Sequence, residues 1–215
     1  MKTLKYDSIL SILLIFMSIG CAKPSSQFFD IPSKVMFGFD QELFSRAMDH
    51  QKKGQIESAI ALWKRFLLKY PNSHEARNNL GLLYYADDEI TKAIYQLGLA
   101  LKLEAGSNRI KGNLLRALKV EVVIHDENKE YDSAILSYKQ IARLSLATEQ
   151  EKIEREIESL EDKIFEQVKK SNLMDEYLGF LKKYPRSHKN SDEARLWVEK
   201  RNKSEQVKKT EQLRF

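Results

Sequence analysis

A helical apolar pattern repeats along the chain at an interval of 34 residues. Between a glycine at position 54 and a proline at position 71, apolar and small side chains recur every three or four residues, which predicts an amphipathic helix. The pattern returns 34 positions later, and a repeat of this length predicts stacked helical units that bury one continuous core. The matching positions are Ile56, Ala59, Ile60, Trp63, Phe66 and Leu67, then Ile90, Ala93, Ile94, Leu97, Ala100 and Leu101.

The composition supports a helical protein. Only 8 of the 215 residues are glycine and 4 are proline, so turn formers are scarce, and clusters of β-branched residues are short. Apolar residues make up 42% and charged residues 31%, which suits one domain with a core and is too charged for a protein with several membrane spans. We therefore expect an all-α domain.

The helix predicted over residues 75–85 resembles the first helix of a tetratricopeptide repeat. Leu80 and Gly81 stand at the family's Leu-Gly pair, and Tyr84 stands at its aromatic position. Gly81 and Ala93 are small because the two helices of one repeat must cross there with their backbones close together. The resemblance implies a right-handed α-solenoid. The residues expected to pack its helix pairs are Ala59, Leu80, Gly81, Tyr84, Ala93 and Ala134.

The third unit is longer than the first two. Ala134 follows Ala93 by 41 positions instead of 34. We place the seven extra residues in the first helix of this unit, over about 113–126, because they add nearly two turns and rotate the apolar face by only about 20°. About three repeats therefore precede the less regular end of the chain.

A fourth helix pair follows in degenerate form. The run Thr148-Glu-Gln-Glu151 predicts a capping box at its start. Glu161 and Leu173 stand where small residues close the helix crossing in the second unit, so the two helices should splay or cross elsewhere. A coiled-coil arm over 149–169 is the alternative interpretation.

The C-terminal end should carry a capping helix and then a basic tail. A helix at about 192–202 would cover the last core surface and complete a repeat domain over 40–203. Residues 200–215 hold six basic and two acidic side chains, so we expect 204–215 to form a basic, solvated tail. Contact with anionic lipid or with a glycan-bound polymer is the alternative for this tail.

One phrase occurs twice in the chain. FLLKYPNSHEAR begins at Phe66 and FLKKYPRSHKNSDEAR begins at Phe180, 114 positions later, a spacing that covers three repeat steps. In each copy Tyr-Pro should end one helix, and the serine and acidic residues that follow should start the next. We interpret the phrase as a helix boundary without chemistry of its own.

The first 20 residues read as a signal peptide. Two lysines precede the apolar run 9–19, which is shorter than the roughly 18 to 20 residues that cross a bilayer. Ser18-Ile19-Gly20-Cys21 resembles the lipobox of bacterial lipoproteins, although Ser18 replaces the usual Leu, Val or Ile. Cys21 is the only cysteine, and lipidation would avoid an unpaired thiol in an oxidising compartment. Cleavage without lipidation and an uncleaved anchor are the alternatives.

Residues 21–39 would then be a lipidated tether rich in aromatic side chains. These aromatics could pack across the first helix or dock on a partner or a membrane surface. By the family's sorting rule, Ala22 after the cysteine implies the outer membrane, with the protein facing the periplasm. The resemblance thus implies a lipid anchor at Cys21.

The sequence favours a protein-binding scaffold over an enzyme. It holds no phosphate-binding loop, no metal-ligand spacing and no set of catalytic residues, so we expect no cofactor, metal, nucleic acid or small-molecule substrate. The resemblance places a peptide-binding groove along the first helices and envelope proteins as its partners. The groove residues that it implies are Met48, Asn78, Leu82, Tyr85, Asn113, Arg116 and Lys119.

Three kinds of outer-membrane lipoprotein with such repeats share this outline. They act in β-barrel assembly, in pilus secretin assembly, and in coordination of the Tol-Pal and peptidoglycan machinery. The sequence does not choose among them. A secreted periplasmic protein without lipid, and a non-catalytic accessory subunit of a peptidoglycan-processing enzyme, are the alternatives.

Overall fold

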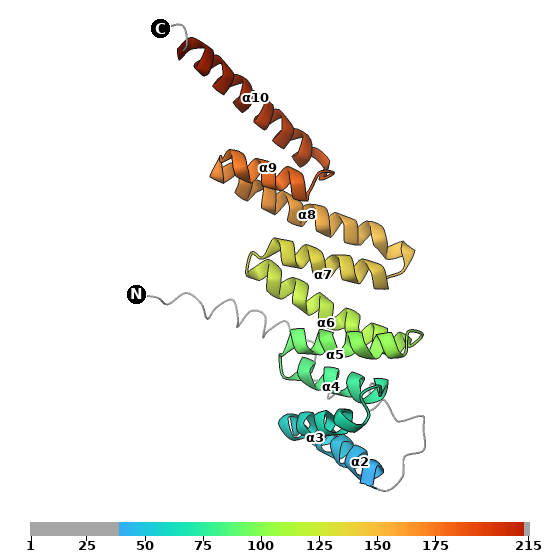
Figure 1. The fold of residues 1–215 in the computed structure, drawn as a ribbon. Helices are drawn as coiled ribbons and strands as arrows, with labels where there is room; N and C mark the ends of the chain where they lie inside the picture. The colour runs from blue at the N-terminus through green and yellow to red at the C-terminus, as the bar shows by residue number, and fades with distance from the viewer. Residues whose placement is uncertain (1–38, 213–215) are drawn as a thin grey trace.

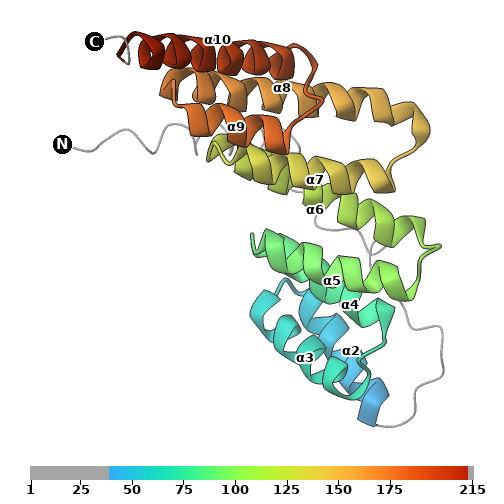
Figure 2. The same ribbon diagram turned by 45° about the horizontal axis from the view of Figure 1, so that its top comes forward.

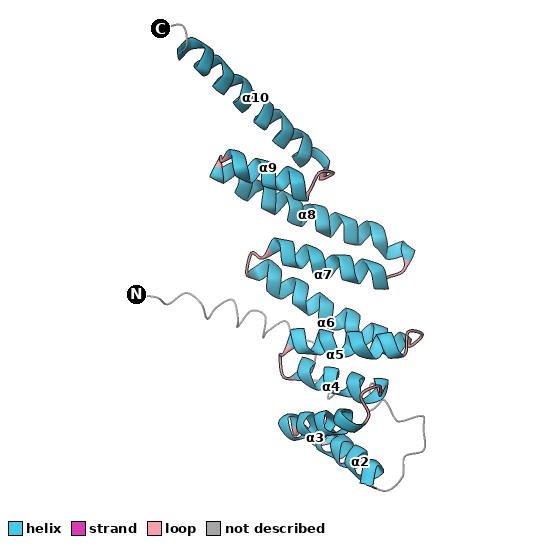
Figure 3. Ribbon diagram, in the orientation of Figure 1, coloured by secondary structure: helices cyan, strands magenta, loops and turns pink. Residues whose placement is uncertain are grey.

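The computed structural model describes residues 39–212, and every regular element within that range is a helix (Figures 1 and 3). Consecutive helices form antiparallel pairs that stack into an elongated α-solenoid (Figure 1). The predicted array of three helix pairs, a fourth pair and a terminal helix is confirmed. The helices are α2 Phe39–Lys52, α3 Ile56–Lys69, α4 His74–Ala86, α5 Ile90–Leu103, α6 Asn108–Glu127, α7 Tyr131–Leu144, α8 Ala147–Ser171, α9 Met174–Lys183 and α10 His188–Gln212.

Small residues close the helix crossings, as the pattern predicts. A Cβ atom added at Gly81 on α4 would lie 2.7 Å from Leu97 Cγ on α5, closer than carbon atoms can pack. Ala93 on α5 is fully buried beside this crossing, and Ala59 and Ala134 are fully buried at the corresponding positions of α3 and α7. The absence of a side chain at Gly81 therefore sets how closely α4 approaches α5.

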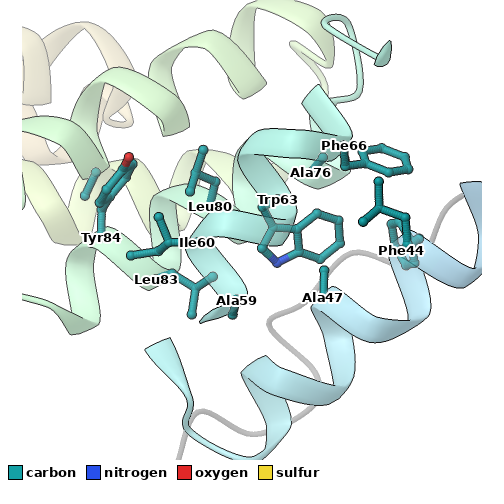
Figure 4. Close-up of a cluster of buried hydrophobic side chains, with 12 residues drawn as sticks. Phe44, Ala47, Ala59, Ile60, Trp63, Phe66, Ala76, Leu80, Leu83 and Tyr84 are labelled. Carbon is teal, nitrogen blue, oxygen red and sulfur yellow. The ribbon is translucent and has the colours of Figure 1, made fainter. Parts of the chain in front are cut away.

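Aromatic rings fill the core of the first unit (Figure 4). The ring of Phe44 on α2 meets Trp63 edge-on at 4.9 Å between centroids and Phe66 at 5.6 Å. The indole Nε1 of Trp63 donates to Gln51 Oε1 at 2.9 Å, so its polar edge is satisfied while the ring is fully buried. This cluster joins α2 to α3.

The extra length of the third unit lies where the sequence predicts it. α6 has 20 residues and α4 has 13, a difference of seven. Both helices start at a serine whose hydroxyl accepts an early backbone N–H: Ser73 from Ala76 at 3.2 Å and Ser107 from Ile110 at 3.3 Å. Because the two starts are equivalent, the extra turns extend the C-terminal end of α6.

The fourth pair begins before the predicted capping box. α8 starts at Ala147, and the Glu149 carboxylate accepts the backbone N–H of Leu146 at 3.3 Å. The prediction of a box from Thr148 to Glu151 is therefore wrong in register. The bond from the backbone to a glutamate side chain is made two residues earlier, where Leu146 in extended conformation precedes the first residue of the helix.

The fourth pair also crosses in an unusual place. α8 has 25 residues, 11 more than α7, so it is about 16 Å longer. α9 folds back against its C-terminal part (Figure 2), where the rings of Phe165 and Phe180 lie 4.9 Å apart. The helices thus cross away from Glu161, the position that sequence reasoning considered too large for a close crossing.

The terminal helix is longer than predicted. α10 runs continuously to Gln212, so the predicted boundary between a capping helix and a basic tail at 203/204 falls inside a helix (Figure 1). Its first half packs on α9 through the stacked rings of Trp197 and Tyr177, 3.9 Å apart. Its second half is exposed and carries the ion pairs Glu199–Lys203 and Arg201–Glu205 between successive turns.

The predicted signal peptide over 1–20, the lipid anchor at Cys21 and almost all of the tether over 21–39 lie outside the described residues. Only Phe39, placed in the tether by the sequence, falls within them as the first residue of α2. Within the described range, none of the helices is both long and apolar enough to cross a membrane.

Candidate binding face

Five of the predicted groove residues lie on one side of the first helices α2, α4 and α6. Met48, Leu82 and Arg116 follow one another at 34-residue steps, and Tyr85 and Lys119 form a parallel row with the same spacing. Arg116 and Lys119 are exposed, while the three apolar members are partly buried. We call this surface, made by Met48, Leu82, Tyr85, Arg116 and Lys119, the first-helix face.

Direct contacts connect the three helices beneath this face. The Asn79 amide nitrogen on α4 lies 3.6 Å from the Met48 sulfur on α2. The Asn113 amide on α6 donates to Asn78 Oδ1 on α4 at 2.9 Å. Because each bond joins neighbouring repeats, α2, α4 and α6 hold the five side chains of the face at fixed separations.

The structure corrects the roles assigned to Asn78 and Asn113. Asn78 is fully buried and Asn113 is 3% exposed, so neither side chain is available to a peptide in this conformation. Their mutual hydrogen bond satisfies polar groups that burial would otherwise penalise. Sequence reasoning placed them in the groove because first helices line it, yet burial within a helix changes from one residue to the next.

Tyr85 is the central apolar residue of the face. It packs against the buried clusters on both sides, that of the first unit and that around α6 and α7. Burial raises the pKa of its hydroxyl, and the positive charge of Arg116 opposes that rise. The face therefore combines an aromatic side chain on α4 with a cation on α6.

Two further apolar residues extend the face along α6. Val123 is 50% exposed and Ile124 is 39% exposed, both in the turns added to this helix. Val123 follows Lys119 by four positions and Arg116 by seven, so the three lie in one stripe of the helix surface. Mapping by 34-residue steps missed both residues because the insertion has no counterpart in the second unit. Following the stripe past Lys119 in the sequence would have identified them.

A small cavity of about 50 Å³ lies where α6, α7 and α8 meet. Burial and the nearby carboxylates of Glu156 and Asp126 raise the pKa of its Tyr138 hydroxyl, while Lys163 Nζ pairs with Asp126 at 2.6 Å. A space of this size holds an ordered water rather than a substrate. Within residues 39–212, no group of three or more His, Cys, Asp and Glu side chains is arranged to hold a metal ion. The cavity lining is Val122, Asp126, Tyr138, Glu156, Ser159, Leu160 and Lys163.

Comparison with known proteins identifies similar sequences and structures. A family model described as "Tetratricopeptide repeat" matches residues 44–109, the part of the chain that holds Met48, Leu82 and Tyr85. A solved structure titled "Crystal structure of MamA protein" is similar over 80% of this chain and 94% of its own, with 20% identity and a TM-score of 0.39. No curated protein matches the chain.

Proposed function

We propose that this chain, a tetratricopeptide-repeat protein, is a scaffold that binds other proteins through its first-helix face. The observation that carries the proposal is the arrangement of partly buried apolar side chains beside two exposed cations on neighbouring first helices. Helical repeat arrays use such surfaces to hold extended or helical peptides. The proposal assigns no catalytic step to the chain.

The chemistry of the face suggests the kind of segment that it would bind. Arg116 and Lys119 lie about one turn apart on α6, and such a pair makes charge-assisted hydrogen bonds to a carboxylate. Leu82, Tyr85 and Val123 offer apolar surface next to these cations. We therefore expect a partner segment with an acidic side chain or a terminal carboxylate beside one or two apolar side chains.

The carboxylate clamp of chaperone-binding repeats is not part of this proposal. Phe44 stands where that clamp has its first lysine, and its ring is buried against Trp63 and Phe66. The two basic side chains of the first-helix face, Arg116 and Lys119, instead both come from α6.

The proposed cellular role is that of a lipid-anchored protein of the bacterial outer membrane, facing the periplasm, with envelope proteins as partners. Its support is the sequence of residues 1–21, with a short apolar run and a lipobox-like end at Cys21. Outer-membrane protein assembly, secretin assembly and coordination of Tol-Pal with peptidoglycan remain the candidate pathways. A periplasmic protein without lipid and an accessory subunit of a peptidoglycan enzyme are the alternatives.

Capture of partners from cross-linked cells tests the binding face. Envelopes would be solubilised in detergent, and proteins bound to the parent would be compared with those bound to Arg116→Glu and Lys139→Glu. Lys139 is an exposed lysine on α7, outside the face, so its variant is the matched control for charge reversal. We expect Arg116→Glu to lose a partner at least several-fold while the control retains it. Equal recovery by all three chains would contradict the proposal.

The lipid anchor has a separate test. A Cys21→Ser chain should lack the acyl mass of the parent and move from the membrane fraction to the soluble fraction. A variant that stays with membranes as fully as the parent, with no difference in acyl mass, would refute the anchor and leave the binding face untouched.

A further inference from the structure

Residues 22–38 are long enough to reach every part of the first-helix face. The chain enters the described fold at Phe39, the first residue of α2. Seventeen residues precede it after Cys21, and an extended chain of that length spans about 56 Å. The path to the far edge of the face runs about 21 Å along α2 and then about 20 Å across two interhelical spacings to α6. This path is shorter than the span of the extended chain.

The same residues carry side chains that match the face. Phe28, Phe29 and Ile31 lie 8 to 11 positions before α2, which corresponds to about 26–36 Å of extended chain and therefore to the distance of α4. Asp30 lies among these three apolar residues. This is the chemistry expected of a ligand for the face, a carboxylate flanked by apolar side chains.

Gln51 has an unsatisfied hydrogen-bond donor at the edge of the same face. It lies 34 positions before Tyr85, in the row that continues to Lys119, and is only 7% exposed. Its Oε1 accepts from Trp63, but its Nε2 is buried without a hydrogen-bond partner. A buried donor left in this way costs about 1–3 kcal/mol, and a backbone carbonyl of a bound segment would satisfy it once the side chain rotates toward the face.

We propose that residues 22–38 lie across the first-helix face of their own chain, with Phe28 and Phe29 near Leu82 and Tyr85, and compete with a partner segment for it. The inference rests on the proposed function in that both use the same face. The tether would then regulate the scaffold, because a partner must displace it before binding. Since the competing segment is covalently attached, its effective concentration is high and only a well-matched partner would displace it.

Cross-linking within the intact chain tests this placement. In a Cys21→Ser background, one chain would carry Phe29→Cys with Leu82→Cys and a control chain Phe29→Cys with Tyr95→Cys. Tyr95 is an exposed residue of α5, outside the face. A short bis-maleimide should join the first pair within one chain at a yield several-fold above the control. Equal yields, or products between two chains that increase with protein concentration, would overturn the proposal.

The labelling rate of the face gives a second measurement that needs no cross-link. Replacing Phe28 and Phe29 by Ala should raise the rate at which a maleimide labels Leu82→Cys several-fold and leave the rate at Tyr95→Cys unchanged. An unchanged rate at Leu82→Cys would also overturn the inference. Neither measurement involves a partner, so failure here is distinguishable from failure of partner capture to depend on Arg116.

Discussion

The hydroxyl of Tyr184, at the end of α9, donates a hydrogen bond to the carboxylate of Asp132, at the start of α7. Lys183 Nζ lies 2.7 Å from the same carboxylate. The other copy of the repeated phrase makes the same arrangement, in which Tyr70 and Lys69 both donate to Asp40 on α2. The phrase therefore marks more than a helix boundary, since each Lys-Tyr pair ties the end of one helix to an acidic residue at the start of another.

Removing the charge of Asp132 should loosen the C-terminal helices. Asp132→Asn weakens the bonds from Lys183 and Tyr184, so we expect a loss of about 1 kcal/mol in the free energy of unfolding. Urea titration measures the loss, and hydrogen exchange should show faster opening of α9 and α10. Glu154→Gln, an exposed change on α8, is the control. Identical exchange in Asp132→Asn and the control would contradict the role given to this contact.

The two carboxylates should make stability depend on acid pH. Hydrogen bonds from Lys69 and Tyr70 lower the pKa of Asp40 from 3.8. Burial alone would raise the pKa of Asp132, but its bonds to Lys183 and Tyr184 lower it overall. Because each folded pKa lies below the unfolded value, both contributions are complete above about pH 4 and are lost as the pH falls through the folded pKa. The melting temperature should therefore fall below pH 4, and less steeply for Asp132→Asn than for the parent.

The crossing of α4 and α5 should not tolerate a side chain at Gly81. Gly81→Ala places Cβ 2.7 Å from Leu97 Cγ, and Leu97 is fully buried, so we expect a destabilisation of about 1–3 kcal/mol. Gly98→Ala is the matched control, because a Cβ there meets nothing within 4 Å and replaces a helical glycine. It should stabilise the protein by up to about 1 kcal/mol. Denaturant midpoints that shift in the same direction for both variants would be incompatible with a close crossing at Gly81.

Variants at Asn113 and Lys119 should affect different properties, the first folding stability and the second partner binding. Asn113→Ala removes the buried bond to Asn78 and should cost about 1–3 kcal/mol of folding free energy. Lys119→Glu changes an exposed side chain and should leave the unfolding midpoint almost unchanged while reducing partner capture. Chemical denaturation and the capture assay, applied to both variants, measure the two effects. A Lys119→Glu chain that binds normally would remove this residue from the binding face.

The exposed half of α10 should be dispensable for folding. A chain that ends at Lys203 loses only side chains that are exposed among the described residues, so its unfolding free energy should change by less than about 0.5 kcal/mol. Trp197→Ala is the contrasting variant, since it removes the ring stacked on Tyr177 and should cost about 2 kcal/mol or more. A large loss on truncation would mean that residues after Lys203 support the core.

The repeat register predicted most of the fold because helix pairing is encoded in local periodicity. The lengthened α6 follows from spacing, and the roles of Gly81 and Ala93 follow from the resemblance to a tetratricopeptide repeat. The burial of Asn78 and Asn113 could not be predicted in the same way, since it depends on how closely α4 and α6 approach. The length of α10 was missed for another reason. A charged run suggests disorder, but a helix that Trp197 already holds against α9 can continue through ion pairs such as Glu199–Lys203.

The length of α8 has a consequence for cooperativity. Ile153 near its start belongs to the cluster with α6 and α7, while Phe165 and Val168 belong to the cluster with α9 and α10, and Ile157 touches both. Repeat arrays commonly fray from their ends, one unit at a time, because each unit contacts only its neighbours. In this protein α8 cannot separate from the last cluster without disturbing the one before it. Opening of α9 and α10 should therefore be coupled to α6 and α7 through α8, instead of stopping at the last helix pair.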